Sequence, residues 1–173
     1  MVASFTIGSI LFGMTDDTNK RILERIKIKY SEPRELPNGE LSRTFFDCIQ
    51  LTPNELSRIA SQAVGDIPVN AFDLVIGIAY TGVFFAAAVA GGRQVGILRL
   101  DGQISGPDVR GKKVLIADDV IFKGKRAKEA IAKVEAAGGN VVGLACIVDR
   151  SHDLSLSKNV PIYSAAQCGS DDD

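Results

Sequence analysis

The sequence contains only one histidine and three cysteines in 173 residues. Cys48, Cys146 and Cys168 are far apart and form no CxxC pair, so we expect neither a disulfide framework nor a zinc site. A single histidine cannot build a histidine-rich metal site, and we interpret His152 as an ordinary loop residue. This cysteine usage is typical of a protein of the reducing cytoplasm.

An excess of charge of one sign is also absent, because 20 Lys and Arg stand against 21 Asp and Glu, a formal net charge of −1. This balance argues against general electrostatic binding of nucleic acid or of an anionic membrane. No apolar run approaches the ~20 residues that span a bilayer. Residues 1–13 lack the basic region of a signal peptide. We therefore expect a cytoplasmic location and no membrane partner.

The composition is that of an ordinary folded domain, with 46% hydrophobic and 24% charged residues. The length fits one α/β domain and leaves little room for a second independent core. Apolar runs predict strands at 73–79, 95–100, 113–117, 140–148 and 160–163, with helices at 82–90 and 125–137. Strands that are apolar throughout and alternate with helices imply a parallel sheet covered on both faces. In such sheets ligands bind beyond the carboxyl ends of the strands.

The N-terminal part is less regular. Ile22, Leu23 and Ile26 share one face of a helix predicted over 15–29. The pattern further predicts a loop at 31–39, which holds two prolines and an Asn-Gly pair, a strand at 45–51, and a helix from Pro53 to about Val64. Thr52 and Glu55 have the spacing of a capping box before this last helix.

The densest chemical signal follows the strand at 113–117. Asp118 and Asp119 stand at its carboxyl end, a loop containing Gly124 follows, and a helix then begins. Helix N-termini bind anions through backbone N–H groups. Two carboxylates beside such a site suit a sugar phosphate, with hydroxyls bound by the acids and phosphate by the amides. Carboxylates are rarely near-buried without a function.

Basic side chains accompany this loop, namely Lys123, Lys125, Arg126 and Lys128. They add positive charge where a phosphate would bind. An equally simple interpretation is that the lysines are solvated residues on an exposed first turn and that Asp119 is a helix cap.

Three other classes of phosphate-related site are excluded by pattern. The chain has neither GxxxxGK[ST] nor GxGxxG, so a Walker P-loop and a dinucleotide fingerprint are absent. A receiver domain carries its acidic pair early, and the residues from 120 to 173 are too few for the rest of that fold.

The ordered motifs of residues 36–166 resemble the type I phosphoribosyltransferases, and within them the orotate enzymes. The segment 114–126 (VLIADDVIFKGKR) resembles the motif that binds phosphoribosyl diphosphate (PRPP). Segment 73–82 (DLVIGIAYTG) is similar to the pyrophosphate loop and the strand before it. Segment 38–47 (NGELSRTFFD) is similar to the SGxxSxYFF segment of the orotate enzymes, and 141–150 (VVGLACIVDR) to their strand ending in Asp-Arg. The resemblance implies a Rossmann-like three-layer α/β sandwich, with a mostly parallel sheet, helices on both faces and a small N-terminal hood.

The resemblance also implies roles for individual residues. Asp118 and Asp119 would bind the ribose hydroxyls of PRPP. The 5-phosphate would bind Phe122, Lys123, Gly124, Lys125 and Arg126; the pyrophosphate would face Ala79, Tyr80, Thr81 and Gly82; the base would contact Phe45, Phe46 and Arg150. Mg²⁺ would enter with the pyrophosphate, with no metal ligand assigned to the protein. The family implies a homodimer in pyrimidine and nucleotide metabolism.

Three departures from the family pattern stand out. The phosphate loop lacks the usual threonines, since Phe122, Lys123 and Arg126 replace small or hydroxyl residues, and Leu41 stands where a base-side lysine is expected. The segment from Arg99 to Arg110 is short and has neither Lys nor His, whereas the orotate enzymes carry there a long flexible loop that closes over the reaction. A closing loop excludes water and supplies charge, so Arg99 is a candidate catalytic substitute.

Three hypotheses therefore stay open. The first is a phosphoribosyltransferase, a pentosyl-transferring glycosyltransferase that joins the ribose 5-phosphate of PRPP to an orotate-type base with release of pyrophosphate. The second is a non-catalytic regulatory protein that binds PRPP or a nucleotide on the same fold. The third is a protein-interaction module with a relic site. In each, residues 1–50 form an N-terminal helix and hood segment, and 51–173 the phosphoribosyltransferase-like core.

Overall fold

The computed structural model describes residues 17–36, 39–151, 156 and 160–168; His152 and residues 1–13 lie outside this set. The helices are α1 (Asp17–Ile26), the 3-10 turn η1 (Cys48–Gln50), α2 (Pro53–Val64), α3 (Gly82–Val89) and α4 (Lys125–Ala136). The strands are β1 (Lys27–Glu35), β2 (Leu41–Phe46), β3 (Leu74–Ile78), β4 (Gln94–Leu98), β5 (Ile104–Ser105), β6 (Lys113–Ile121), β7 (Asn140–Asp149) and β8 (Ile162–Gln167). None of the described helices is long and apolar enough to cross a membrane.

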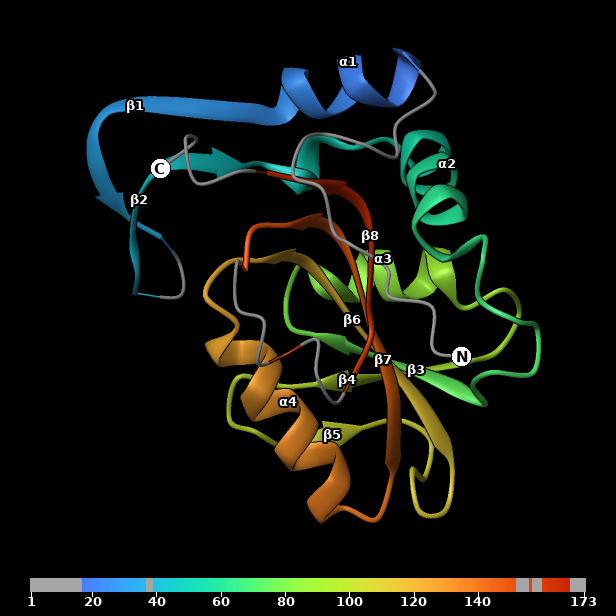
Figure 1. Cartoon of the computed structure of the whole chain (residues 1–173). Coiled ribbons are helices and arrows are strands. Elements are labelled where there is room, and N and C mark those ends of the chain that lie inside the picture. Colours follow the sequence, from blue (N-terminus) through green and yellow to red (C-terminus); the bar gives the residue numbers. More distant parts are fainter. Residues whose placement is uncertain (1–16, 37–38, 152–155, 157–159, 169–173) are drawn as a thin grey trace, which may run out of the picture.

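A six-stranded sheet forms the centre of the molecule, in the order β5-β4-β3-β6-β7-β8 (Figure 1). All neighbouring strands pair in parallel except β5, which runs antiparallel to β4 at one edge. Each of the five predicted strands of this sheet is present, and the short β5 is the one addition. The predicted three-layer α/β architecture is confirmed, and the order places β3 and β6 side by side at its centre.

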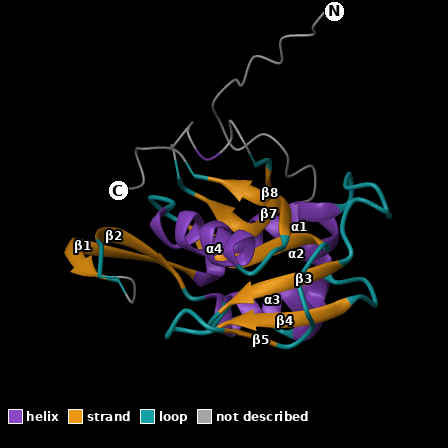
Figure 2. Ribbon diagram, turned by 90° about the horizontal axis from the view of Figure 1, so that it is seen from below, coloured by secondary structure: helices purple, strands orange, loops and turns teal. Residues whose placement is uncertain are grey.

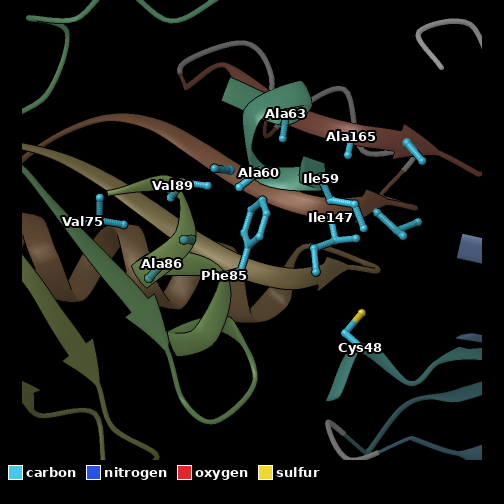
Figure 3. Packing of buried hydrophobic residues seen from close by; sticks show 14 of the residues in the cluster. Cys48, Ile59, Ala60, Ala63, Val75, Phe85, Ala86, Val89, Ile147 and Ala165 are labelled. Carbon is cyan, nitrogen blue, oxygen red and sulfur yellow. The ribbon is translucent and has the colours of Figure 1, made fainter. Parts of the chain in front are cut away.

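Alternate residues of the central strands face opposite layers of helices, as the period of a strand requires. Val75 and Leu115 belong to the cluster that packs against α1, α2 and α3, whereas Ile76 and Ile116 pack toward α4. In Figure 3, the ring of the fully buried Phe85 lies among residues of α2 and β7. Both faces of the sheet are covered, which explains why the strands read as continuous apolar runs (Figure 2).

A two-stranded antiparallel ribbon, β1–β2, stands beside this core. The predicted loop at 31–39 is wrong over 31–35, because β1 continues to Glu35. The pairing register shifts between Lys29 and Arg34, and this irregular stretch contains Pro33. Proline is tolerated in a strand at such a bulge or edge, so it does not end the strand here.

The predicted strand at 45–51 is also corrected, since β2 ends at Phe46 and residues 48–50 form a 3-10 turn. The buried positions of β2 include Ser42 and Thr44, so its inward face carries polar side chains and escapes a search for apolar alternation. The helix predicted over 15–29 ends earlier, at Ile26, and its last residues open β1.

The capping box of α2 is present as predicted, since Thr52 Oγ1 accepts a hydrogen bond from Glu55 N while Thr52 N donates to Glu55 Oε2. Replacing Thr52 by alanine removes one acceptor and should lower the free energy of unfolding by ~1 kcal/mol. For a chain of this length that corresponds to roughly 2–4 °C in Tm. Thermal unfolding followed by circular dichroism measures it. Asn54→Ala, on the same exposed turn, is the matched control, and an equal loss in both variants would contradict the capping role.

Candidate functional site

The two acidic residues lie within β6, which continues to Ile121, and they stand where its buried stretch ends. Asp118 is only 4% exposed, and Asp119 is half-buried. Asp118 Oδ1 accepts a hydrogen bond from Asp119 N at 3.0 Å. The pair therefore stands at the carboxyl end of a central strand, where the open edge of a parallel sheet binds ligands.

Burial raises the pKa of Asp118 well above its ordinary value, and the neighbouring charge of Asp119 raises it further. The guanidinium of Arg126 acts in the opposite direction. Asp118 is thus a carboxylate whose charge is costly in the absence of a ligand that hydrogen-bonds to it. Such perturbed groups cluster at functional sites.

The start of α3 approaches the acidic strand very closely. A Cβ on Gly82 would lie 2.8 Å from the carbonyl oxygen of Ala117 and 2.9 Å from Asp118 Oδ1. No side chain fits there, so glycine is required for the loop 79–82 to lie against β6. This contact brings the predicted pyrophosphate loop to the predicted ribose-binding acids.

The loop after β6 begins α4 with Gly124 at φ +75°, a conformation that favours glycine. A Cβ there would overlap the side chain of Leu156. Gly124 has no side chain that could cap the first turn of α4. The backbone N–H groups of this turn lie at the N-terminal end of the helix, which is the end that binds anions.

A shallow pocket of about 40 Å³ lies at this helix start and is lined by Asp118 together with residues 120–127. The volume is roughly three times the ~10–15 Å³ that one water molecule needs. Glu40 also lines this pocket. Sequence reasoning did not single out Glu40, which precedes β2 and is brought to the pocket by the ribbon.

The side chain of Arg126, in the first turn of α4, reaches the loop 79–82. Its Nη2 donates a hydrogen bond of 2.5 Å to the carbonyl oxygen of Ala79. The peptide bond between Ala79 and Tyr80 is cis. Ala79, Arg126 and Arg99 all line a second pocket of about 360 Å³, so Arg126 lies where the two pockets meet.

The short segment after β4 folds back as a hairpin. Arg99 N donates to the carbonyl oxygen of Gln103 at 2.9 Å, and β5 then pairs with β4. Arg99 itself is exposed and forms an ion pair of 3.0 Å with Asp101. The segment that would carry a closing loop is therefore tied to the sheet edge, with Arg99 at the mouth of the larger pocket.

Arg150 is 3% exposed and joins three parts of the molecule. Its Nη1 donates to the carbonyl oxygen of Thr44 at 2.9 Å, its Nη2 bonds Ser42 Oγ at 3.1 Å, and its guanidinium stacks 4.5 Å from the centroid of the Phe122 ring. Lys123 Nζ lies 5.2 Å from the same ring. The ribbon is thus anchored to the phosphate loop, a connection that the sequence did not predict.

The other predicted site residues are placed around this centre. Tyr80 is 72% exposed, Phe45 is half-buried, and Phe46 is buried with Lys27 Nζ at 5.9 Å from its ring. Lys123 and Lys125 are exposed. Their roles toward a base, a pyrophosphate or a phosphate stay predictions.

A third pocket of about 440 Å³ lies between η1, α2 and α3 and includes Thr81. Its lining is dominated by apolar residues such as Leu56 and Phe84, and no charged side chain of the described residues borders it. This pocket does not suit a phosphate. Charged side chains line the two pockets that share Arg126.

Comparison with known proteins agrees with this geometry. Residues 94–169 match the family model described as the phosphoribosyl transferase domain. The orotate phosphoribosyltransferase of Chlorobium phaeobacteroides is 33% identical over 154 residues, covering 78% of this chain and 79% of that protein. The enzyme of the same name from Caldanaerobacter subterraneus is 30% identical over 158 residues, covering 83% and 80%.

Solved structures with the same fold include the orotate phosphoribosyltransferase of Aeropyrum pernix, with a TM-score of 0.70 at 21% identity over 86% of this chain and 93% of that one. The Mycobacterium tuberculosis orotate phosphoribosyltransferase in complex with PRPP has a TM-score of 0.67 at 22% identity over 87% and 94%. The fold is that of these phosphoribosyltransferases. The chain belongs to the phosphoribosyltransferase family, and the relatives named here are its orotate-type members.

The buried charge of Asp118 predicts a pH-dependent stability. Because its pKa is raised in the folded protein, the unfolded chain ionises first as pH rises above the ordinary value of 3.8, and stability falls. Asp118→Asn removes this cost and keeps the acceptor for Asp119 N. At pH 8 we expect a Tm higher than that of the wild type, and a difference that vanishes at low pH.

Differential scanning calorimetry over a pH series measures this effect. Asp66→Asn, which changes an exposed carboxylate before β3, is the matched control and should leave Tm unchanged. A lower Tm of Asp118→Asn at pH 8 would show that the charged form is stabilised by the fold.

Proposed function

We propose that the protein transfers the 5-phosphoribosyl group of PRPP to a nucleobase, with a pyrimidine of the orotate type as the first candidate, and releases pyrophosphate. One observation carries this proposal: the acidic pair of β6, the glycine-capped start of α4 and the loop 79–82 meet at one edge of the sheet. Carboxylates for ribose hydroxyls and a helix terminus for a phosphate are what PRPP requires.

In the proposed reaction a ring nitrogen of the base attacks the anomeric carbon, and the bond from that carbon to the pyrophosphate oxygen breaks. Positive charge develops on the ribose, and negative charge grows on the leaving group. Asp118 and Asp119 would orient the ribose by accepting hydrogen bonds from its hydroxyls. Positioning and electrostatic stabilisation supply the rate enhancement, because the protein forms no covalent bond with the sugar in this scheme.

Mg²⁺ fits this donor set as a companion of the pyrophosphate. The described residues contain no cluster of three or more metal-ligating side chains, whereas Asp118 and Asp119 offer the hard oxygen donors that Mg²⁺ uses together with substrate phosphates. When bound, the ion would neutralise charge on the pyrophosphate. Holding the ribose remains the task of the two carboxylates.

A second candidate, a regulatory protein that binds PRPP or a nucleotide without transfer, is favoured by two observations. The β4–β5 hairpin ties down the segment where a closing loop is expected, and Arg150 is engaged by Thr44, Ser42 and Phe122. The hairpin takes the place of a loop that would exclude water from the reaction. The contacts of Arg150 engage a side chain that was predicted to contact the base. The transferase requires PRPP binding and turnover, whereas the regulatory protein binds PRPP or a nucleotide without turnover.

The decisive experiment measures pyrophosphate release from PRPP and Mg²⁺ with orotate and a panel of other bases, alongside PRPP binding by calorimetry. Asp119→Asn and Asp118→Asn should each lower kcat/KM about 10- to 100-fold, the value of a lost hydrogen bond to a charged acceptor. Asp66→Asn should retain full activity.

Binding of PRPP without release for any base would favour the regulatory protein. Absence of PRPP binding by the wild-type protein would overturn the transferase, and absence of nucleotide binding as well would overturn the regulatory protein. Because Asp118→Asn is expected to be at least as stable as the wild type, a loss of its activity cannot be attributed to unfolding.

A further inference from the structure

Arg126 stands at a position from which it can serve either of two phosphate groups. It belongs to the first turn of α4, beside the small pocket of the phosphate loop, and also lines the pocket of about 360 Å³ beyond Ala79. The resemblance to the family alone placed it with the 5-phosphate. The contacts of its side chain indicate the other of the two phosphate groups.

The guanidinium reaches loop 79–82. Its Nη2 donates to the carbonyl oxygen of Ala79 at 2.5 Å, and its charge acts on the buried carboxylate of Asp118. The side chain therefore crosses from one loop to the other at the level of the predicted ribose site. This bond fixes the position of the guanidinium and of the loop together.

Most of the donor capacity of Arg126 remains available. An arginine has five N–H donors in a planar fork that suits phosphate oxygens, and the bond to Ala79 is the one hydrogen bond that its side chain makes with the described residues. The side chain is half-buried and borders the larger pocket. The bond to Ala79 thus holds the guanidinium at a wall of that pocket. An incoming anion can bind the remaining N–H donors without displacing Ala79.

The charges of the larger pocket favour an anion near its mouth. Arg99, Arg126 and Lys133 line it against Asp101 and Glu129. Asp101 is already paired with Arg99 at 3.0 Å. Arg99 follows β4 and Arg126 belongs to α4, so two separate elements bring these charges to one pocket.

Resting on the proposed function, we propose that Arg126 binds the pyrophosphate group of PRPP from the larger pocket, while the backbone of the phosphate loop holds the 5-phosphate. Arg126 then supplies positive charge to the leaving group from a fixed position. In this chain a tight β4–β5 hairpin stands where a closing loop would bring positive charge to the leaving group. Arg126 of α4 supplies that charge instead. Arg99 lines the same pocket and adds a second positive charge.

The test separates the two ends of PRPP. Binding of pyrophosphate and of ribose 5-phosphate, each with Mg²⁺, is measured by calorimetry for the wild type and for Arg126→Ala. We expect pyrophosphate to bind about 10- to 100-fold more weakly to the variant, since a charged hydrogen-bonding partner is lost, and ribose 5-phosphate to bind within about twofold of the wild type. Arg126→Lys, which keeps the charge without the fork, should recover part of the pyrophosphate affinity.

Arg21→Ala is the matched control, because it removes the same charge from an exposed position on α1, where Arg21 pairs with Asp17. It should change neither affinity. Weaker binding of ribose 5-phosphate to Arg126→Ala, alone or to the same extent as pyrophosphate, would overturn the assignment and leave the proposed function standing. If the wild type binds neither ligand, the proposed function itself fails.

Discussion

The close approach of Gly82 to the end of β6 is the constraint on which the site depends. Because no Cβ fits between this glycine and Asp118, the chain entering α3 lies directly against the acidic strand. Two loops that are distant in sequence thereby share one edge of the sheet. Asp118 is buried beside this contact, and burial together with the charge of Asp119 raises its pKa. A buried carboxylate of this kind lowers the free energy of unfolding, which is a common cost of a binding site.

Two arginines hold the surroundings of this contact in place, and each does so through a backbone carbonyl. Arg126 bonds the carbonyl oxygen of Ala79, and Arg150 bonds that of Thr44 while stacking on Phe122. The first joins the two candidate phosphate loops, and the second joins the ribbon to the phosphate loop. Arginine suits this task because its planar fork can bond one partner and still stack or donate elsewhere.

The departures from the family pattern become connected in the folded chain. A loop without threonines replaces hydroxyl donors by Phe122, Lys123 and Arg126, and the β4–β5 hairpin replaces a long segment. Phe122 forms the stacking surface for Arg150, whereas Arg126 reaches the neighbouring loop. These substitutions act in the structure as links between elements. Function through the backbone of the phosphate loop does not require side-chain hydroxyls, since helix N–H groups are retained.

The sequence alone determined the layers of the fold and the position of the acidic pair, because apolar strands, a capping box and a strand–acid–glycine–helix pattern are local signals. It misjudged β1 and β2, where Pro33 lies in an irregular stretch of the ribbon and the inward face carries Ser42 and Thr44. Only the tertiary structure decided where Arg126 and Arg150 point and that Glu40 borders the phosphate pocket. Long polar side chains find partners across elements, and such partners follow from how the elements pack, not from the spacing of residues along the chain.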